Sequence, residues 1–370
     1  MAIKRIAQIH YVATILFALA FLALPLNVFS DDKTPAPAEK GKLDAWFSSN
    51  IAKKDAVNET LAAAEKEAAK VIKVRTDGSG DFKTVMDAIK SIPSGNTKRV
   101  VVDIGSGVYK EKIKIERTQP FVTLYGSPKA MPNLTFNGDA AKYGTVDSAT
   151  LIVEGDYFVA VNLNIVNSSP KPDGKRKGAQ AAAIRVSGDK NAFFNCKFFG
   201  FQDTVCDDRG HHLFKDCYIE GTVDFIFGDG KSLYLNTELN VIEDRESQMT
   251  VITANARDNA NEESGFSFVH CKVGGTGNGT YLGRAWMESP QVVFAFTEMT
   301  GVVNPEGWSD NRQPSRDKTI FYGEYQCSGA GSSLDGRVKY SKQLTETEVQ
   351  PFISLGFIQG SSWLLPPPSL

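Results

Sequence analysis

Asp224 stands in an apolar stretch of the 370-residue chain, GTVDFIFGDG, and a second aspartate, Asp203, stands upstream in the segment GFQDTV. An ionised carboxylate is costly to bury unless a counter-ion or hydrogen-bond donors compensate it. The two aspartates are 21 residues apart, and Gln180 precedes Gln202 by 22 residues. If one turn of a repetitive fold takes about 21 residues, these polar side chains stack on one face of successive turns.

Two carboxylates that lie close together cannot both ionise freely, so one keeps a proton while the other stays charged. The charged carboxylate can act as a nucleophile or base, and the protonated one as a general acid. The side-chain amides of Gln180 and Gln202 are neutral donors, which suit an oxyanion that forms in a transition state. This inventory indicates acyl-transfer chemistry without serine, histidine or a metal ion, and the sequence contains no G-x-S-x-G motif.

Arg284 in the segment YLGRAW supplies the cation that a buried, ionised carboxylate requires. A guanidinium group can hold a carboxylate through two parallel hydrogen bonds. Trp286, two residues further on, offers a flat apolar face on which a sugar ring could stack. Each motif also has a purely structural explanation as a polar ladder, a turn cap or a core tryptophan. Because three of the motifs share one step along the chain, the chemical interpretation is favoured.

The elements that must position these residues are short β-strands. From Arg99 onward, β-rich runs follow one another, separated by Gly, Asn and Asp, with no long helical pattern between them. Cys196, Cys217 and Cys271 occupy equivalent positions in the runs FFNCKFFG, LFKDCYIEG and SFVHCKVGG. A weak repeat of short strands predicts an all-β fold, a parallel β-helix whose coils share one core. A β-sandwich is the alternative, but the Asn-Gly and Asp-Gly turns of β-hairpins are scarce.

The cysteines and histidines do not indicate a metal site. Free cysteine packs as a small apolar side chain, so we expect the three cysteines of the repeat in the core. Zinc would need Cys or His pairs at a closer spacing than this sequence provides. The pair His211-His212, beside the segment DDRG, is expected on a solvated loop.

The segments before and after the β-rich region are predicted to differ from it in structure. Residues 31–42 have the composition of a flexible lead, residues 55–74 that of a helix rich in Ala, Glu and Lys, and residues 81–92 that of a second short helix. Trp363 and the leucines beside it are expected to pack a C-terminal segment onto the solenoid.

Residues 1–30 have the pattern of a secretory signal. Lys4 and Arg5 precede an apolar core, and the small residue Ser30 stands at the expected cleavage point. A membrane anchor is the alternative, because the apolar run approaches the ~20 residues that cross a bilayer. The polar, Pro-containing segment that follows favours cleavage.

The remaining composition excludes some classes of protein. The sequence has 41 Lys and Arg against 43 Asp and Glu, and two of the basic residues fall within 1–30, so nothing indicates nucleic-acid binding. Five cysteines are too few for a disulfide-built scaffold, although a secretory route permits one or two bridges. Four Asn-x-Ser/Thr triplets also fit that route, at Asn58, Asn133, Asn167 and Asn278.

The segments that carry the candidate chemistry closely resemble motifs of the plant pectinesterases, also called pectin methylesterases. They are GVYKE at 107–111, GAQAAA at 178–183, GFQDTV at 200–205, DFIFG at 224–228 and LGRAW at 282–286. The resemblance implies a right-handed parallel β-helix with short flanking helices at the two termini. Such enzymes remove methyl esters from homogalacturonan (pectin), releasing methanol and leaving pectate. The implied organisation is a signal peptide at 1–30, a partly helical lead at 31–70, a catalytic domain at 71–366 and a tail at 367–370.

The resemblance also implies a role for each candidate residue. Asp224 would be the nucleophile. Asp203 would protonate the departing methoxide and then act as base toward water. Gln202 would stabilise the oxyanion. The residues that would contact substrate are Thr145, Gln180, Arg284 and Trp286, with Arg284 also orienting Asp224.

The resemblance implies no cofactor and no metal ion. It implies a secreted monomer of the plant cell wall that binds methyl-esterified pectin and a pectinesterase inhibitor protein. Only about 40 residues separate Ser30 from the catalytic domain, so we expect a short, pollen-type member without the helical pro-domain of many relatives. Val205 and Cys206 follow Thr204 where many members have Leu-Tyr, a change that flanks the site without removing a catalytic group.

Two other classes of protein remain open from the sequence. A pectin-cleaving lyase or hydrolase could use the same solenoid, but a lyase is expected to cluster acidic residues for calcium. Here Asp203 and Asp224 are interleaved with glutamines and aromatics. A non-catalytic carbohydrate-binding solenoid would keep Trp286 but has no reason to combine the two aspartates with Arg284.

Overall fold

The computed structural model describes residues 33–51, 57–244, 246, 249–368 and 370. The signal segment predicted at 1–30 therefore lies outside the described residues. Among those that are described, no helix is both long enough and apolar enough to cross a membrane.

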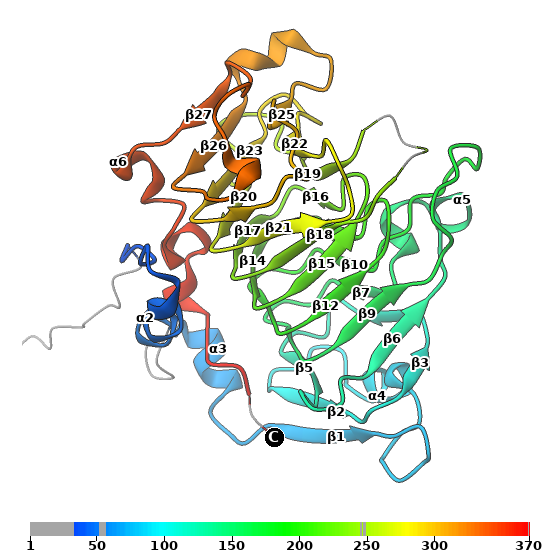
Figure 1. The fold of residues 1–370 in the computed structure, drawn as a ribbon. Coiled ribbons are helices and arrows are strands. Elements are labelled where there is room, and N and C mark those ends of the chain that lie inside the picture. The colour runs from blue at the N-terminus through cyan, green and yellow to red at the C-terminus, as the bar shows by residue number, and fades with distance from the viewer. Residues whose placement is uncertain (1–32, 52–56, 245, 247–248, 369) are drawn as a thin grey trace, which may run out of the picture.

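The chain winds into a parallel β-helix whose walls are three parallel sheets (Figure 1). Each coil contributes one strand to each sheet in turn, so neighbours within a sheet are a whole coil apart in sequence. Within the described residues, the first sheet has 11 strands. In spatial order they are β1 (Lys70–Val74), β2 (Val100–Ile104), β5 (Val122–Gly126), β8 (Val159–Val161), β11 (Asn191–Phe194), β14 (His211–Lys215), β17 (Lys231–Leu235), β20 (Gly265–Val269), β23 (Gln291–Ala295), β26 (Phe321–Tyr325) and β27 (Ser341–Gln343).

The part of the chain that the structure describes contributes eight strands to each of the second and third sheets. The second contains β3 (Val108–Lys110), β6 (Asn133–Phe136), β9 (Asn164–Asn167), β12 (Lys197–Phe199), β15 (Tyr218–Gly221), β18 (Glu238–Val241), β21 (Lys272–Gly275) and β24 (Glu298–Met299). The third contains β4 (Ile113–Ile115), β7 (Leu151–Val153), β10 (Ile184–Val186), β13 (Val205–Asp207), β16 (Ile226–Gly228), β19 (Val251–Asn255), β22 (Tyr281–Arg284) and β25 (Trp308–Ser309). This arrangement confirms the fold class predicted from the sequence.

The step inferred from the aspartates is the coil length around them. In the third sheet Ile184 pairs with Val205 and Val205 with Ile226, each a step of 21 residues. Later coils are longer, since Ile226 pairs with Thr253 and Thr253 with Gly283. The extra residues lie in the turns between strands. Residues at equal offsets from paired strands therefore become neighbours ~4.8 Å apart.

Stacked aromatic rings fill the interior behind the first sheet. Consecutive ring centroids are 4.4–4.6 Å apart in the series Phe193, Phe214, Tyr234, Phe268 and Phe294. These rings stack because the parallel register places equivalent side chains of successive coils directly over one another. The stack stabilises the coils through both apolar burial and ring contacts.

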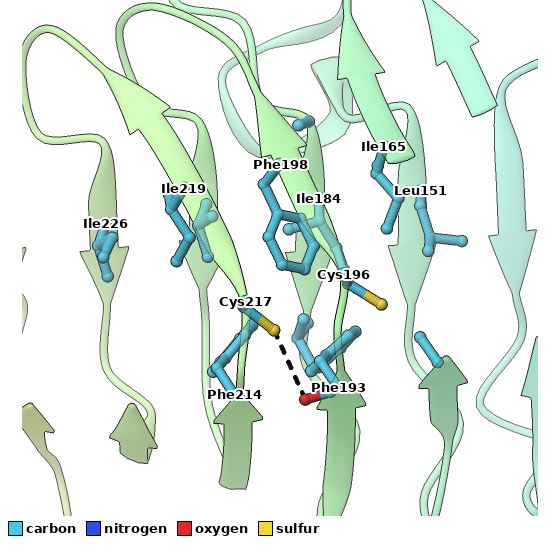
Figure 2. Packing of buried hydrophobic residues seen from close by; sticks show 14 of the residues in the cluster. Leu151, Ile165, Ile184, Phe193, Cys196, Phe198, Phe214, Cys217, Ile219 and Ile226 are labelled. Carbon is cyan, nitrogen blue, oxygen red and sulfur yellow. Dashed lines mark hydrogen bonds between the residues drawn. The ribbon is translucent and has the colours of Figure 1, made fainter. Parts of the chain in front are cut away.

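The cysteines of the repeat lie in this core, as predicted. Cys196, Cys217 and Cys271 are at most 3% exposed. The thiol of Cys217 donates to the carbonyl of Phe193 (3.6 Å), as Figure 2 shows. All five cysteines of the chain are free thiols. Burial raises the pKa of Cys196 and of Cys271 to about 12, which makes both thiols unreactive.

The two terminal segments form a second apolar core on the outer face of the first sheet. Ala36 and Trp46 are buried there beside Trp363, which confirms that the C-terminal segment packs onto the solenoid. The amide of Ala36 donates to the carbonyl of Ile353 (2.7 Å). The prediction of a flexible lead at 31–42 is thus wrong for its described part. This segment packs against the apolar outer face of the first sheet and removes apolar surface from water.

The helices are short. They are η1 (Lys40–Lys42), α2 (Leu43–Asn50), α3 (Glu59–Ala64), α4 (Val85–Lys90), α5 (Ala140–Tyr143), η2 (Val146–Ser148), η3 (Pro314–Lys318), η4 (Ala330–Ser332), α6 (Glu346–Val349), η5 (Leu355–Ile358) and η6 (Gly360–Ser362). The helix α4 falls within the predicted range 81–92. The helix predicted over 55–74 is wrong beyond α3, because the end of this range pairs with β2 as strand β1. β-Branched residues and sheet pairing override helix propensity there.

Candidate active site

Asp203 and Asp224 occupy equivalent positions in adjacent coils. Each lies two residues before a strand of the third sheet, and these strands, β13 and β16, pair Val205 with Ile226. The amide of Asp203 donates to the carbonyl of Val223 (3.0 Å). The two turns therefore run side by side, and the prediction that the aspartates are neighbours is confirmed.

Both aspartates have left-handed backbone conformations, with φ of 68° at Asp203 and 48° at Asp224. Asparagine and aspartate tolerate this region better than most residues with a side chain. The approach to Asp224 is tight, since a Cβ at Gly221 would lie 2.2 Å from the Cβ of Phe225. Backbone strain of this kind gathers at functional sites, where the surrounding structure enforces it.

Arg284 is the counter-ion of Asp224. From the end of β22, its Nε donates to Oδ1 of Asp224 (2.8 Å) and its Nη2 donates to Oδ2. This two-point contact fixes the carboxylate while its other lone pairs stay available. The Nη1 atom of the same guanidinium donates to Oδ1 of Asn311 (3.2 Å). Arg284 is therefore positioned by Asn311 while it binds Asp224.

The environments of the two carboxylates set their pKa values apart. Asp203 is 8% exposed and Asp224 is 5% exposed. Burial and the neighbouring charge of Asp224 hold the pKa of Asp203 well above its usual value, against a weaker opposing effect of Arg284. Burial also raises the pKa of Asp224, but its hydrogen bonds and ion pair with Arg284 counteract this. The proton is thus favoured on Asp203 over Asp224, whose ionised form Arg284 stabilises.

The two glutamines lie on the same row of turns. Gln202 directly precedes Asp203, and the amide of Ala181 donates to the carbonyl of Gln202 (3.2 Å). Gln180 is therefore one position away from exact register with Gln202, and both side chains are half-buried. Both glutamines thus lie on turns that neighbour the carboxylate pair, and the prediction that their amides face the carboxylates stays a prediction.

Thr145 lies further out, immediately before η2. Its carbonyl accepts from the hydroxyl of Ser148 (2.6 Å), and that hydroxyl accepts from the amide of Ala182 (3.0 Å). These bonds anchor the Thr145 segment to the turn that carries Gln180. Within the described residues, no direct contact joins the Thr145 side chain to either aspartate.

Trp286 presents an exposed ring next to the carboxylate pair. Its side chain is 50% exposed, and the guanidinium carbon of Arg284 lies 4.7 Å from the ring centroid. A cation over an aromatic face stabilises both groups. A large exposed aromatic beside a buried charged cluster is typical of a binding surface.

Two further residues support this site, and the sequence did not single them out. Arg316 donates from Nη1 to the carbonyls of Ala285 (2.6 Å) and Trp286 (3.1 Å). Asn311 binds Arg284 from the turn after β25. Asparagine favours turns and tolerates the positive φ of 58° that Asn311 adopts, so the sequence signals a turn there but no contact with Arg284.

The prediction for the histidine pair is wrong. His211 and His212 begin strand β14, and His212 is fully buried. Its Nδ1 lies 2.5 Å from Oδ1 of Asp207, and its Nε2 lies 2.9 Å from the carbonyl oxygen of Gly188. A polar stretch resembling a loop is thus a strand, because Asp207 from the preceding strand satisfies the buried imidazole.

Comparison with known proteins agrees with this geometry. A family model described as pectinesterase matches residues 71–361. The chain is 56% identical over 360 residues to putative pectinesterase 63 of Arabidopsis thaliana, an alignment that covers 97% of this chain and 99% of the relative. It is 52% identical to pectinesterase 2 of Olea europaea, with 94% of each chain covered.

Solved structures share the fold. The pectin methylesterase from carrot matches with a TM-score of 0.75 and 30% identity, over 80% of this chain and 96% of that chain. A pectin methylesterase with one aspartate replaced by alanine, in complex with a hexasaccharide, matches with a TM-score of 0.66 and 27% identity, over 80% of this chain and 98% of that chain. On sequence over nearly its whole length and on its fold, this chain belongs to the pectinesterase family.

Proposed function

We propose that this pectinesterase, a carboxylic ester hydrolase, opens the methyl esters of homogalacturonan with Asp224 as nucleophile and Asp203 as acid and base. The unequal pairing of the two carboxyls carries this assignment. Arg284 binds both oxygens of Asp224. Asp203 has no side-chain hydrogen bond within the described residues, and its pKa is raised by burial and by Asp224.

In the first half-reaction, an unshared lone pair of the Asp224 carboxylate attacks the carbonyl carbon of the methyl ester. Negative charge moves to the carbonyl oxygen, where the amide of Gln202, assisted by Gln180, donates hydrogen bonds. The bond from carbon to methoxide then breaks. Asp203 gives its proton to the methoxide, methanol leaves, and the galacturonyl group remains on Asp224 as a mixed anhydride.

The second half-reaction restores the enzyme. Asp203, now ionised, takes a proton from a water molecule, and the resulting hydroxide attacks the galacturonyl carbonyl. The anhydride bond breaks, which releases the pectate carboxyl and returns the Asp224 carboxylate to Arg284. Asp203 again holds one proton, so each cycle converts one ester and one water into one acid and one methanol.

The sugar chain is proposed to lie against Trp286, with Gln180 and Thr145 contacting it on the other side of the carboxylate pair. The exposed ring of Trp286 supports this placement, since carbohydrate rings stack on such faces. Related pectin methylesterases in complex with hexasaccharides give further support. The proposed partner is therefore methyl-esterified homogalacturonan.

We also propose that the protein is secreted and acts as a monomer in the plant cell wall, without a cofactor. Its plant relatives and the signal-like composition of residues 1–30 support this localisation. A pectinesterase inhibitor protein is the proposed regulatory partner.

The reaction is tested by measuring methanol release from methylated pectin while polymer length is followed in parallel. Methanol without shortening of the chains is the expected result. Shortening with unsaturated ends would instead identify a lyase, and pectin binding with neither product would identify a binding module.

A further inference from the structure

The four Asn-x-Ser/Thr triplets differ sharply in what the fold does with their asparagines. Asn167 is 3% exposed. Its side-chain nitrogen donates to the carbonyls of Gly138 (2.9 Å), Ser148 (3.2 Å) and Ala182 (2.8 Å). An oligosaccharide on that nitrogen would have to enter the turn beside Gln180, so this acceptor is incompatible with the folded protein.

Two other asparagines are committed to local contacts. The side chain of Asn58 caps α3 by accepting from the amide of Leu61 (3.0 Å), and its nitrogen donates to the carbonyl of Ser362 (2.8 Å). Asn133 is half-buried in β6, where it accepts from the side-chain nitrogen of Asn164 (2.9 Å). Attachment of an oligosaccharide to either asparagine would therefore break hydrogen bonds, which is not the case for an exposed asparagine without side-chain partners.

Asn278 is exposed and has no side-chain hydrogen bond within the described residues. It stands at the tip of the turn between β21 and β22. Gly277 and Gly279 flank it, and a Cβ at Gly277 would lie 2.5 Å from Cγ1 of Val241. The backbone of the turn therefore packs closely against Val241, whereas the side chain of Asn278 is exposed to solvent.

We propose that Asn278 carries an Asn-linked oligosaccharide and that Asn167 does not. The side-chain nitrogen of Asn278 attacks C1 of the first sugar of an oligosaccharide carried on a lipid pyrophosphate. The bond from C1 to the pyrophosphate oxygen breaks, the nitrogen loses one proton, and the lipid pyrophosphate leaves. Thr280 completes the acceptor triplet.

This glycan would stand on the edge of the site. The turn of Asn278 belongs to the same row of turns as those of Asp203 and Asp224, between the second and third sheets. It lies two coils from Asp224, about 10 Å at the usual strand spacing, in the coil that also supplies Arg284. The strands of these coils, β16, β19 and β22, follow one another in Figure 1. We infer that the glycan restricts one approach to the substrate groove, an inference that rests on the proposed function.

Occupancy is tested on the full chain secreted from plant cells. A peptide amidase that removes plant-type glycans is used in heavy-oxygen water, so each formerly glycosylated asparagine becomes a labelled aspartate. Label at position 278 and none at position 167 is the expected result. Asn278→Gln should lose the glycan, whereas Thr280→Ser, which keeps an acceptor triplet, should retain it. An unmodified Asn278 in the secreted enzyme, or label at Asn167, would overturn the proposal.

Placement beside the groove is tested separately by kinetics. Asn278→Gln should raise kcat/KM on long methylated pectin and leave that on short methylated oligogalacturonate unchanged, relative to Thr280→Ser. Equal ratios on both substrates would show that the glycan lies clear of the groove even where Asn278 is occupied. Loss of methanol release by every form would instead count against the proposed function, since occupancy is read by mass and not by activity.

Discussion

Strand β13 has a buried aspartate near each end, and the two differ in their hydrogen-bond partners. At its end, Asp207 is fully buried and accepts from the hydroxyl of Tyr234 (2.7 Å) as well as binding His212. Just before its start, Asp203 is nearly as buried but has no side-chain partner within the described residues. One of these two carboxyl groups thus has protein hydrogen-bond donors, and the other has none within the described residues.

The number of hydrogen-bond donors distinguishes a carboxylate that stabilises the fold from a carboxyl group that can transfer a proton. A buried carboxylate whose lone pairs are occupied by donors stabilises the fold and has little left to offer a substrate. A buried carboxyl without donors keeps its proton instead, and that proton is available for transfer. The number of partners, and not burial alone, marks Asp203 as the candidate acid.

The charge state of His212 follows from the same reasoning. Both ring nitrogens have acceptors within hydrogen-bond distance, Asp207 and the carbonyl of Gly188. Donation to both acceptors at once requires the protonated imidazolium, which the Asp207 carboxylate stabilises. Burial alone would lower the pKa of His212, but the Asp207 carboxylate and these hydrogen bonds raise it above its ordinary value.

The largest expected effect comes from Asp224→Asn. An amide cannot form the mixed anhydride, so kcat should fall on the order of 10⁴-fold or more. Asparagine tolerates the left-handed backbone of this position, so the fold should survive. Methanol release and thermal unfolding are measured on the same preparation. Near-wild-type turnover would remove Asp224 from the mechanism.

Asp203→Asn should lower kcat by roughly 10²–10⁴-fold, the usual contribution of general acid-base catalysis. The raised pKa of Asp203 means that the wild-type enzyme loses its acid, and hence activity, as pH rises through that pKa. The basic limb of the pH profile should therefore disappear in the variant. A basic limb that stays in place would assign the proton donor to another group.

His212→Leu tests the satisfied end of β13. It leaves Asp207 buried with one donor fewer, which should lower the free energy of unfolding by about 3–5 kcal/mol. His211→Leu is the matched control, since its partner Asp189 is partly exposed, and it should cost about 1 kcal/mol. The kcat of the folded fraction should stay unchanged. Equal stability losses in the two variants would contradict the structural role of His212.

The pH dependence of that stability has a definite sign. Because the pKa of His212 is raised in the folded state, its contribution is fully present below the ordinary histidine pKa of about 6.5. The contribution is lost as pH rises through the folded-state pKa. The difference in unfolding free energy between wild type and His212→Leu should therefore shrink at high pH, as urea titrations at several pH values would show.

The smallest effect is expected for Asn311→Gly, which removes the contact behind Arg284 without disturbing the positive φ. A hydrogen bond to a charged group is worth about 1.5–3 kcal/mol, and we expect roughly tenfold lower kcat. The acidic limb should move to higher pH, because Asp224 ionises less readily. Arg312→Gly, the next residue with φ of 59°, controls for added backbone freedom. An unchanged acidic limb in Asn311→Gly would leave Asn311 without a positioning role.

The site could be predicted from the sequence where it depends on one regular step. The 21-residue spacing of Asp203 and Asp224 equals the coil length of the third sheet, so counting residues brought them together. Arg284 reaches back over two longer coils, and only the need of a buried carboxylate for a cation indicated it.

The rest depends on contacts that no spacing reveals. Asn311 and Arg316 meet the site through irregular turns, and His212 was hidden because its neighbours are polar. The composition of residues 55–74 predicts a helix, but the end of this range forms strand β1, because pairing with β2, 30 residues away in sequence, decides its conformation. Long-range pairing and turn geometry are set by the folded chain and leave little local signal.

A measurement of the protonation state of Asp203 tests most directly whether Asp203 is the acid and Asp224 the nucleophile. Infrared difference spectra of the ligand-free enzyme, recorded above the ordinary carboxyl pKa of about 4, report protonated carboxyl groups. We predict a carboxylic-acid carbonyl band that is absent from Asp203→Asn and still present in Asp207→Asn. A band that persists in Asp203→Asn, or no such band in the wild-type enzyme, would contradict the division of roles between the two aspartates.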